Sequence, residues 1–212
     1  MSLIIAFAGS REAIIGGDKR SIAFLGSCPA LEDELYSGKI KNDEELVARA
    51  NDLGATLQIS DGREKVWIRS DEKGDKNLLV GEVTEISLSS DRRRRIYLTP
   101  GAYLMAEIAG GEAKITGEGR SGCIILGNIL TQRLAAEAIR NAGGRLSEEI
   151  MKSIFTDIGS KTASVSREYA VLCAGAPLSN PRPNPRSNPR DVLLAALQED
   201  CRKSGWRLCG QQ

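Results

Sequence analysis

Apolar residues near the N-terminus come in short, unbroken runs that are separated by polar turns. Residues 3–8 and 13–17 form two such runs on either side of residues 9–12, and residues 21–25 form a third. Unbroken apolarity, in contrast to strict alternation, is typical of strands that are covered on both faces. The pattern therefore predicts that the chain opens with a strand, a turn and a second strand, followed by a third strand.

The periodicity changes after this opening, and residues 30–54 are predicted to be helical. Asn42 followed three residues later by Glu45 fits a helix N-cap with its reciprocal partner, and Gly54 stands where a helix would stop. The Asp-Gly pair at 61–62, between two strand-like runs, then predicts a β-hairpin. Strands are expected over residues 55–60, 64–69, 78–88, 96–98, 102–109 and 123–126.

The C-terminal half carries two helical stripes, over residues 129–142 and from Ser147 onward, and then a strand over residues 169–174. Residues 176–190 contain Asn-Pro-Arg three times, which predicts a stiff and extended connector. A last helix is expected in residues 191–212, where it either docks on the preceding domain or binds a partner. This order of elements is typical of an α+β fold and not of a doubly wound nucleotide-binding fold.

Composition excludes several classes of enzyme. The 212 residues include no histidine, which excludes Ser-His-Asp triads, Cys-His pairs and His-ligated zinc. A net charge of +1 favours neither nucleic acid nor an anionic membrane as a partner. The five cysteines lack C-x-x-C spacing, and no phosphate-binding or cofactor motif occurs. We expect a protein without metal, cofactor, nucleic-acid partner or stable membrane insertion, with free thiols in a reducing cytoplasm.

The N-terminus itself offers acid–base chemistry that needs no histidine. Removal of Met1 would leave Ser2 first, with a hydroxyl and a free α-amine on adjacent carbons. An α-amine has an ordinary pKa of about 7.7–8.0, so part of it is neutral at neutral pH and can accept the hydroxyl proton. This predicts Ser2 as a nucleophile that carries its own base, although very many ordinary proteins also begin with Met-Ser.

The opening resembles that of proteasome β subunits, which begin at a nucleophilic residue, run through a hairpin and carry an acid just before an arginine. Asp18 and Arg20 follow Ser2 at the spacing of that family. The resemblance implies an Ntn-hydrolase-like αββα sandwich over residues 1–175, with a helical and β-hairpin insertion at about 26–90. A bland alternative for Asp18 is a solvated turn carboxylate.

The same resemblance points to Gly110 as the glycine of an oxyanion hole, but Arg95 stands where that family has its catalytic lysine. Arginine does not lose its proton in proteins and cannot relay one, although it can lower the pKa of a neighbouring amine. The proton relay therefore needs a substitute, for which Lys39 and Lys41 are candidates.

A narrower resemblance rests on six stretches: Met-Ser-Leu-Ile-Ile-Ala at the start, Gly-Gly-Asp-Lys-Arg at 16–20, Glu-Leu-Tyr-Ser-Gly-Lys-Ile-Lys at 34–41, Asp-Glu-Glu-Leu at 43–46, Gly-Ala-Tyr-Leu at 101–104 and Glu-Asp-Cys-Arg-Lys-Ser-Gly-Trp at 199–206. These stretches resemble the connectases, which are archaeal protein ligases of methanogens. The resemblance implies a monomer that cleaves after the aspartate of a Lys-Asp-Pro-Gly-Ala motif and joins the acyl part to a peptide beginning with proline.

In that family the natural protein substrate is a subunit of the membrane methyltransferase complex of methanogens. A basic wall would suit an acidic substrate segment, and Arg20, Lys39, Lys41 and Arg94 are the candidates for it. Two other interpretations stay open: a peptidase or amidase with the same N-terminal nucleophile, and a proteasome-like module without activity that binds partners.

Overall fold

A computed structural model describes residues 3–69, 78–87, 90–144, 146–175 and 188–209 of the chain. Chain segments that alternate along the sequence build two compact units. The first unit contains the chain up to Ile5, Gly16–Lys65 and Ile125–Val171, and the second contains Ala6–Ile15, Val66–Ile124 and the chain from Leu172 onward. Both units combine strands with helices, which confirms the mixed α+β class. The αββα layering and the bounds of the insertion stay predictions.

The predicted strand–turn–strand opening is confirmed. β1 (Ile4–Ala8) and β2 (Glu12–Asp18) are neighbours in a four-stranded sheet of order β10-β1-β2-β11. The other two strands are β10 (Gly122–Leu126) and β11 (Tyr169–Gly175). Burial along β2 continues to its last residue, so the strand ends on a buried carboxylate.

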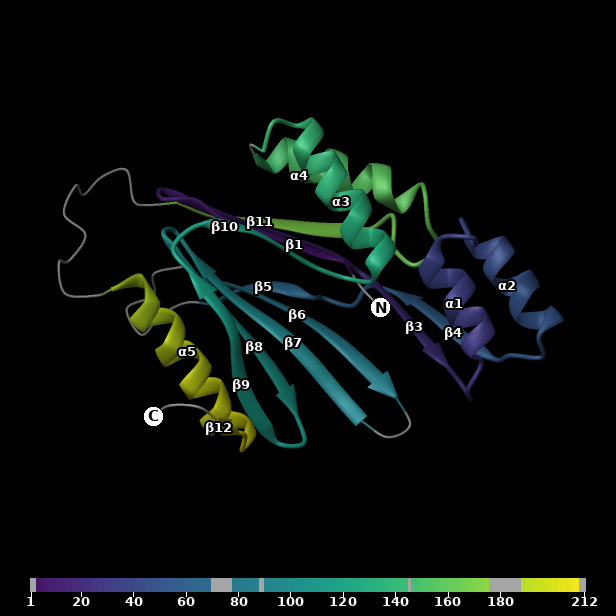
Figure 1. Ribbon diagram of the computed structural model, residues 1–212, viewed down its shortest axis with the longest axis horizontal. Helices are drawn as coiled ribbons and strands as arrows, with labels where there is room; N and C mark the ends of the chain where they lie inside the picture. The colour runs from purple at the N-terminus through teal and green to yellow at the C-terminus, as the bar shows by residue number, and fades with distance from the viewer. Residues whose placement is uncertain (1–2, 70–77, 88–89, 145, 176–187, 210–212) are drawn as a thin grey trace. The chain divides into compact units, whose positions relative to one another are not determined.

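A two-stranded antiparallel sheet follows, formed by β3 (Arg20–Phe24) and β4 (Leu57–Asp61). Figure 1 shows this two-stranded sheet beside α1 (Pro29–Ser37) and α2 (Asp43–Asp52), which lie between its strands in the sequence. Alternation along both strands gives the two-stranded sheet one apolar face, which packs on the two helices. The cluster contains Ile22, Phe24, Leu57 and Ile59 from the sheet and Leu31, Leu35, Leu46 and Ala50 from the helices.

The helical prediction for residues 30–54 is confirmed, and one expectation next to it is wrong. The region holds two helices, because Gly38 with a φ of 82° ends α1 and Asn42 starts α2. As predicted, the side chain of Asn42 accepts a hydrogen bond from the N–H of Glu45, at 2.8 Å. The expected hairpin around residues 61–62 does not form, since β4 pairs with β3 and β5 (Val66–Arg69) pairs with β6 (Leu78–Ser87).

The two helices predicted in the C-terminal half are confirmed as α3 (Ile129–Asn141) and α4 (Glu148–Gly159). Their N-cap residues are Asn128 and Ser147, whose side chains accept hydrogen bonds from Thr131 and Ile150. No helix within the described residues is long and apolar enough to cross a membrane.

The second unit is built on a six-stranded sheet of order β12-β9-β8-β7-β6-β5. Its further strands are β7 (Ser90–Thr99), β8 (Ala102–Ala109), β9 (Glu112–Gly119) and β12 (Arg207–Cys209). The C-terminal helix α5 (Pro189–Ser204) lies beside this sheet in Figure 1, and it packs on the sheet through Leu193, Leu197 and Cys201. The helix predicted within residues 191–212 is thus present, and residues 207–209 after it pair with β9 in parallel. Residues 176–187 of the expected connector lie outside the described residues.

Candidate functional site

A fully buried carboxylate lies at the end of β2. Asp18 has no exposed surface, and its Oδ1 accepts hydrogen bonds from the Leu3 N–H at 2.7 Å and the Lys65 ammonium at 2.8 Å. Its Oδ2 accepts the Arg20 N–H at 2.9 Å and the Ser166 N–H at 3.3 Å. The N–H of Asp18 also donates to the Leu3 carbonyl oxygen at 3.1 Å. Asp18 therefore anchors the start of the chain, and the reading of a solvated turn carboxylate is wrong.

Lys65, which follows β4 and its turn, is the charged partner of Asp18. Its residue surface is only 3% exposed, and its Nζ also donates to the Arg20 carbonyl oxygen at 2.6 Å. Burial lowers the pKa of Lys65, and the nearby Asp18 carboxylate offsets this only in part. A buried lysine with a lowered pKa can exchange a proton at a pH where an arginine cannot.

The Arg20 side chain joins three elements around this pair. Its guanidinium donates to both carboxylate oxygens of Asp61 and both of Asp43, and also to the Ala163 carbonyl oxygen at 2.8 Å. These bonds use all five N–H donors of an arginine. Hydrogen bonding to Asp61 raises the pKa of Arg20, and Arg20 in turn lowers the pKa of Asp61.

The segment after α4 completes the surroundings of Asp18. Thr162, Ser164 and Ser166 are fully buried, and their hydroxyls form hydrogen bonds within the segment. Asn128 adds a bond from its amide to the Ser164 hydroxyl at 3.3 Å. Gly159 at the end of α4 packs closely on this segment, since a Cβ there would lie 2.9 Å from the Ser166 carbonyl oxygen. The backbone next to Asp18 is therefore fixed from several sides.

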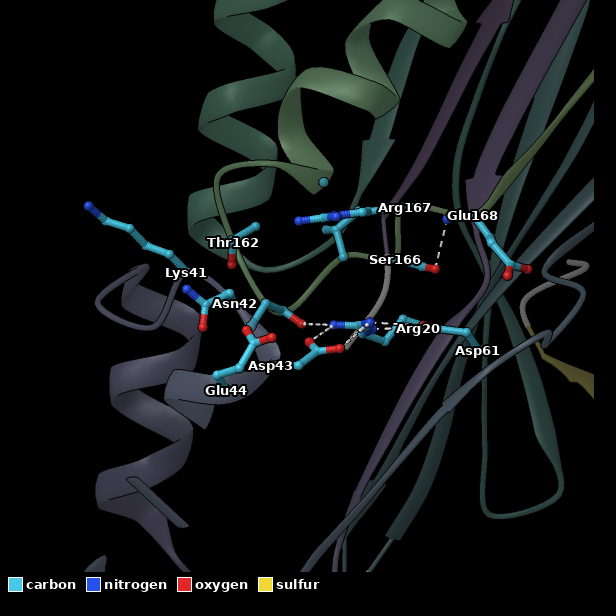
Figure 2. A pocket seen from close by; sticks show the side chains of 13 residues that line it. Arg20, Lys41, Asn42, Asp43, Glu44, Asp61, Thr162, Ser166, Arg167 and Glu168 are labelled. Carbon is cyan, nitrogen blue, oxygen red and sulfur yellow. Dashed lines mark hydrogen bonds and ion pairs between the residues drawn. The ribbon is translucent and has the colours of Figure 1, made fainter. Parts of the chain in front are cut away.

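A pocket of about 280 Å³ opens beside this cluster. Figure 2 shows Arg20 in it, bound to Asp43, Asp61 and a backbone oxygen, with Arg167 extending over the cluster and the ammonium end of Lys41 pointing away. The walls come from α2 with the residues before it, from β4 and from residues 159–168. The lining residues that carry charge are Arg20, Lys41, Asp43, Glu44, Asp61, Arg167 and Glu168.

A second, more open hollow of about 500 Å³ lies over the polar face of the β3–β4 sheet. Most side chains on this face are short: Ser21 and Ala23 of β3 pair with Ser60 and the longer Gln58 of β4. Asp61 borders both the pocket and the hollow. The two therefore meet at the residue that holds one side of the Arg20 guanidinium.

Arg95, which the sequence placed at the lysine position, has other partners. It lies in β7 of the second unit, where its guanidinium donates to Glu82 and Asp200 at distances of 2.5–2.8 Å. Its guanidinium carbon also lies 5.6 Å and 5.1 Å from the ring centroids of Trp67 and Trp206. Asp18 receives its side-chain charge partner from Lys65 and not from Arg95. The expected lysine substitutes, Lys39 and Lys41, do not hold that place either.

The other predicted site residues lie apart from the Asp18 cluster or outside the described residues. Gly110 and Gly111 have φ values of 58° and 77° in the turn between β8 and β9, a conformation that explains glycine there without an oxyanion role. Arg94 lies in β7 opposite Glu107 of β8. Lys39 is exposed at the end of α1 and does not line the pocket. Ser2 lies outside the described residues.

Sequence reasoning missed the most informative residue of the site, Lys65. It stands alone before the apolar run of β5, and nothing in its neighbourhood distinguishes it from a surface lysine. The sequence likewise contains no motif that identifies Ser166 as a site residue. The contacts of both residues with Asp18 span 47 and 148 positions, so only the folded chain brings them together.

A match to a protein family spans almost the entire chain. The family described as "Connectase MJ0548-like, N-terminal domain" matches residues 1–201. The chain belongs to the connectase family. Comparison with curated protein sequences gives no match.

Two solved structures are similar to this connectase chain at low identity. A mutant of Anbu from Hyphomicrobium sp. strain MC1 is 8% identical, with 97% of this chain and 96% of that chain covered and a TM-score of 0.47. Eukaryotic HslV from Trypanosoma brucei is 11% identical, with 82% and 99% covered and a TM-score of 0.44. Both TM-scores lie below 0.5, so these two structures add nothing to the description of the site.

Proposed function

We propose that the chain is a sequence-specific protein ligase with an N-terminal serine nucleophile. After removal of Met1, the Ser2 hydroxyl attacks the carbonyl carbon of the aspartate in a Lys-Asp-Pro-Gly-Ala-like motif. The Asp–Pro bond breaks, and an acyl group remains on the enzyme. The substrate is a protein, for which a methyltransferase-complex subunit of methanogens is the natural candidate, and the chain acts as a cytoplasmic monomer.

The observation that carries this proposal is the buried Asp18–Lys65 pair, bonded directly to Leu3. The Leu3 N–H donates to Asp18 at 2.7 Å, and consecutive Cα atoms lie about 3.8 Å apart. The residue that directly follows the proposed nucleophile in the chain is therefore bonded to the partner of a lysine whose pKa burial lowers. This arrangement supports a self-contained acid–base site in a chain that has no histidine.

The proton balance of the proposed reaction is simple. The Ser2 hydroxyl gives its proton to the free α-amine or to neutral Lys65 while the new C–O bond forms. That proton then passes to the proline nitrogen as the Asp–Pro bond breaks. In the second half, the nitrogen of an incoming proline attacks the ester carbon, and its proton returns to the Ser2 oxygen. Lys65 takes the relay role for which Arg95 is unsuited.

The acyl group can also move between the oxygen and the amine of Ser2 through a five-membered ring. An amide formed in this way resists water better than an ester does, and the reverse shift restores the ester when the second peptide arrives. Ligation also requires that the second peptide be held in place. The pocket and the hollow that meet at Asp61 suit a reaction with two peptide partners.

A peptide-exchange assay tests the proposal. The chain is incubated with one peptide containing Lys-Asp-Pro-Gly-Ala and a labelled second peptide that begins Pro-Gly-Ala, and products are followed by mass spectrometry. We expect an exchanged product, an intact mass without Met1, and no product from Ser2→Ala. Net cleavage without exchange would favour the peptidase interpretation. Retention of Met1, or no reaction, would favour a module that only binds partners.

A further inference from the structure

Among the cations that line the pocket beside Asp18, Arg20 is not available to a ligand. All five of its N–H donors are taken by Asp43, Asp61 and Ala163. Lys41 is exposed, and its ammonium end points away from the Arg20 cluster in Figure 2. Neither residue is therefore placed to recognise an anionic group inside the pocket.

Arg167 differs from both. Its side chain is exposed on the pocket wall, and within the described residues it forms no hydrogen bond or ion pair. Figure 2 shows its guanidinium extending over the Arg20 cluster. A guanidinium is a planar fork of donors that matches a carboxylate in two parallel hydrogen bonds.

The backbone of Arg167 is held in place by its neighbours, although its side chain is exposed. The preceding Ser166 N–H donates to Asp18, and the following Glu168 N–H donates to the Ser166 hydroxyl at 2.9 Å. Gly159 packs so closely that a Cβ there would come within 3.6 Å of the Arg167 Cα. A fixed backbone with an unpartnered guanidinium suits a specificity residue, because only the side chain, and not the backbone, has to be ordered on binding.

We propose that Arg167 is a specificity-determining residue that binds the carboxylate of an acidic side chain in the peptide segment held by the pocket. This inference rests on the proposed function, which supplies the peptide. Glu44 and Glu168 on the same walls repel an anion elsewhere in the pocket. The place under the Arg167 guanidinium is thus where a substrate aspartate is favoured over its amide.

Binding measured without turnover tests the inference. Fluorescence anisotropy gives the affinity of Ser2→Ala full chain for two labelled peptides, one with Lys-Asp-Pro-Gly-Ala and one with Lys-Asn-Pro-Gly-Ala. We expect preference for the aspartate peptide, and a loss of roughly 10- to 100-fold in that affinity when Arg167→Ala is added, with the asparagine peptide unaffected. Arg167→Lys should keep part of the preference. Arg133→Ala, an exposed arginine on α3, serves as the matched control and should change nothing.

Equal weakening of both peptides by Arg167→Ala would overturn the inference, because it would indicate a structural role. An unchanged preference in Arg167→Ala, or no binding of either peptide to the starting protein, would overturn it as well. Discriminating binding that depends on Arg167, combined with no exchange by the chain that retains Ser2, would support the inference and refute the ligase proposal alone.

Discussion

At the scale of single residues, the site depends on one buried ion pair. Asp18 and Lys65 have side chains that are 0% and 2% exposed, and their charged atoms lie 2.8 Å apart. Taking two charges out of water is costly, so such a pair is poor evidence for stability by itself. Each partner is nevertheless needed once the other is buried, which makes the pair a sensitive place for substitution.

Lys65→Met should therefore destabilise the fold strongly. It leaves the Asp18 carboxylate buried without its counter-charge, for which we expect a loss of about 3–5 kcal/mol in the free energy of unfolding. Urea denaturation measures the change. The matched control is Lys161→Met, which removes an exposed lysine paired with Asp157 and should cost about 1 kcal/mol or less. A Lys65→Met protein as stable as the control would show that the pair is absent.

The proposed relay gives Lys65 a second signature, in the pH dependence of exchange. Burial lowers the pKa of Lys65, so its neutral fraction rises with pH and kcat/KM should rise through that lowered pKa. Lys65→Arg keeps the charge beside Asp18 but cannot relay a proton, so kcat/KM should fall about 100-fold or more at every pH.

Lys19→Arg is the control for this experiment. Lys19 is a neighbouring lysine whose ammonium pairs with Glu64 on the surface, outside the Asp18 cluster. Its profile should match that of the unchanged protein. Full activity in Lys65→Arg would remove Lys65 from the mechanism and leave the α-amine as the sole base.

At the scale of elements, the site is assembled where α4 ends and the segment of buried hydroxyls begins. Gly159, the last residue of α4, allows the Ser166–Arg167 backbone to approach the helix end. A helix with any other residue at this point would have to displace that backbone. The same backbone carries the Ser166 N–H that binds Asp18, so helix packing and site geometry are linked through one residue.

Gly159→Ala should therefore harm the protein even though alanine is the better helix former. The new Cβ would lie 2.9 Å from a carbonyl oxygen that cannot move freely, which should cost about 1–3 kcal/mol. We also expect slower peptide exchange, because the Ser166–Asp18 hydrogen bond shifts. Gly175→Ala is the control: a Cβ at Gly175 meets nothing within 4 Å. Thermal unfolding that is the same for the two variants would contradict the close approach.

At the scale of the whole molecule, the sequence was informative wherever a signal is local. The caps at Asn42, Asn128 and Ser147 act within three residues of themselves, and two of them marked helix starts in advance. The Asp-Gly pair at 61–62 misled, because an extended run after a turn can pair with any strand that tertiary packing provides. Lys65 carried no local mark at all, since its partner Asp18 lies 47 positions away.

Long-range partners also set how the stability of the whole chain responds to pH. One unit contributes at acid pH and the other at alkaline pH. In the first unit, Arg20 lowers the pKa of Asp61 below its ordinary 3.8. The interaction of ionised Asp61 with Arg20 therefore stabilises the fold fully above pH 3.8, and this stabilisation is lost as the pH falls through the lowered pKa. In the second unit, burial and the bond to Asp200 raise the pKa of Tyr97 above its ordinary 10.0. The protonated Tyr97 therefore stabilises the fold fully below pH 10, and this stabilisation is lost as the pH rises through the raised pKa.

Denaturation at a series of pH values should accordingly show a free energy of unfolding that falls on both sides of a central range. Asp61→Asn should flatten the acid limb of the plot of unfolding free energy against pH and leave the alkaline limb unchanged. The unfolded chain then lacks the proton that it takes up on Asp61, at low pH, more readily than the folded chain does. Tyr97→Phe should do the reverse, although losing the hydroxyl bond to Asp200 lowers the plateau as well. Asp61 and Tyr97 share no partner among the described residues, so each substitution should change the slope of one limb only. An equal change of both limbs by either substitution would show that the two clusters are not separate sources of the pH response.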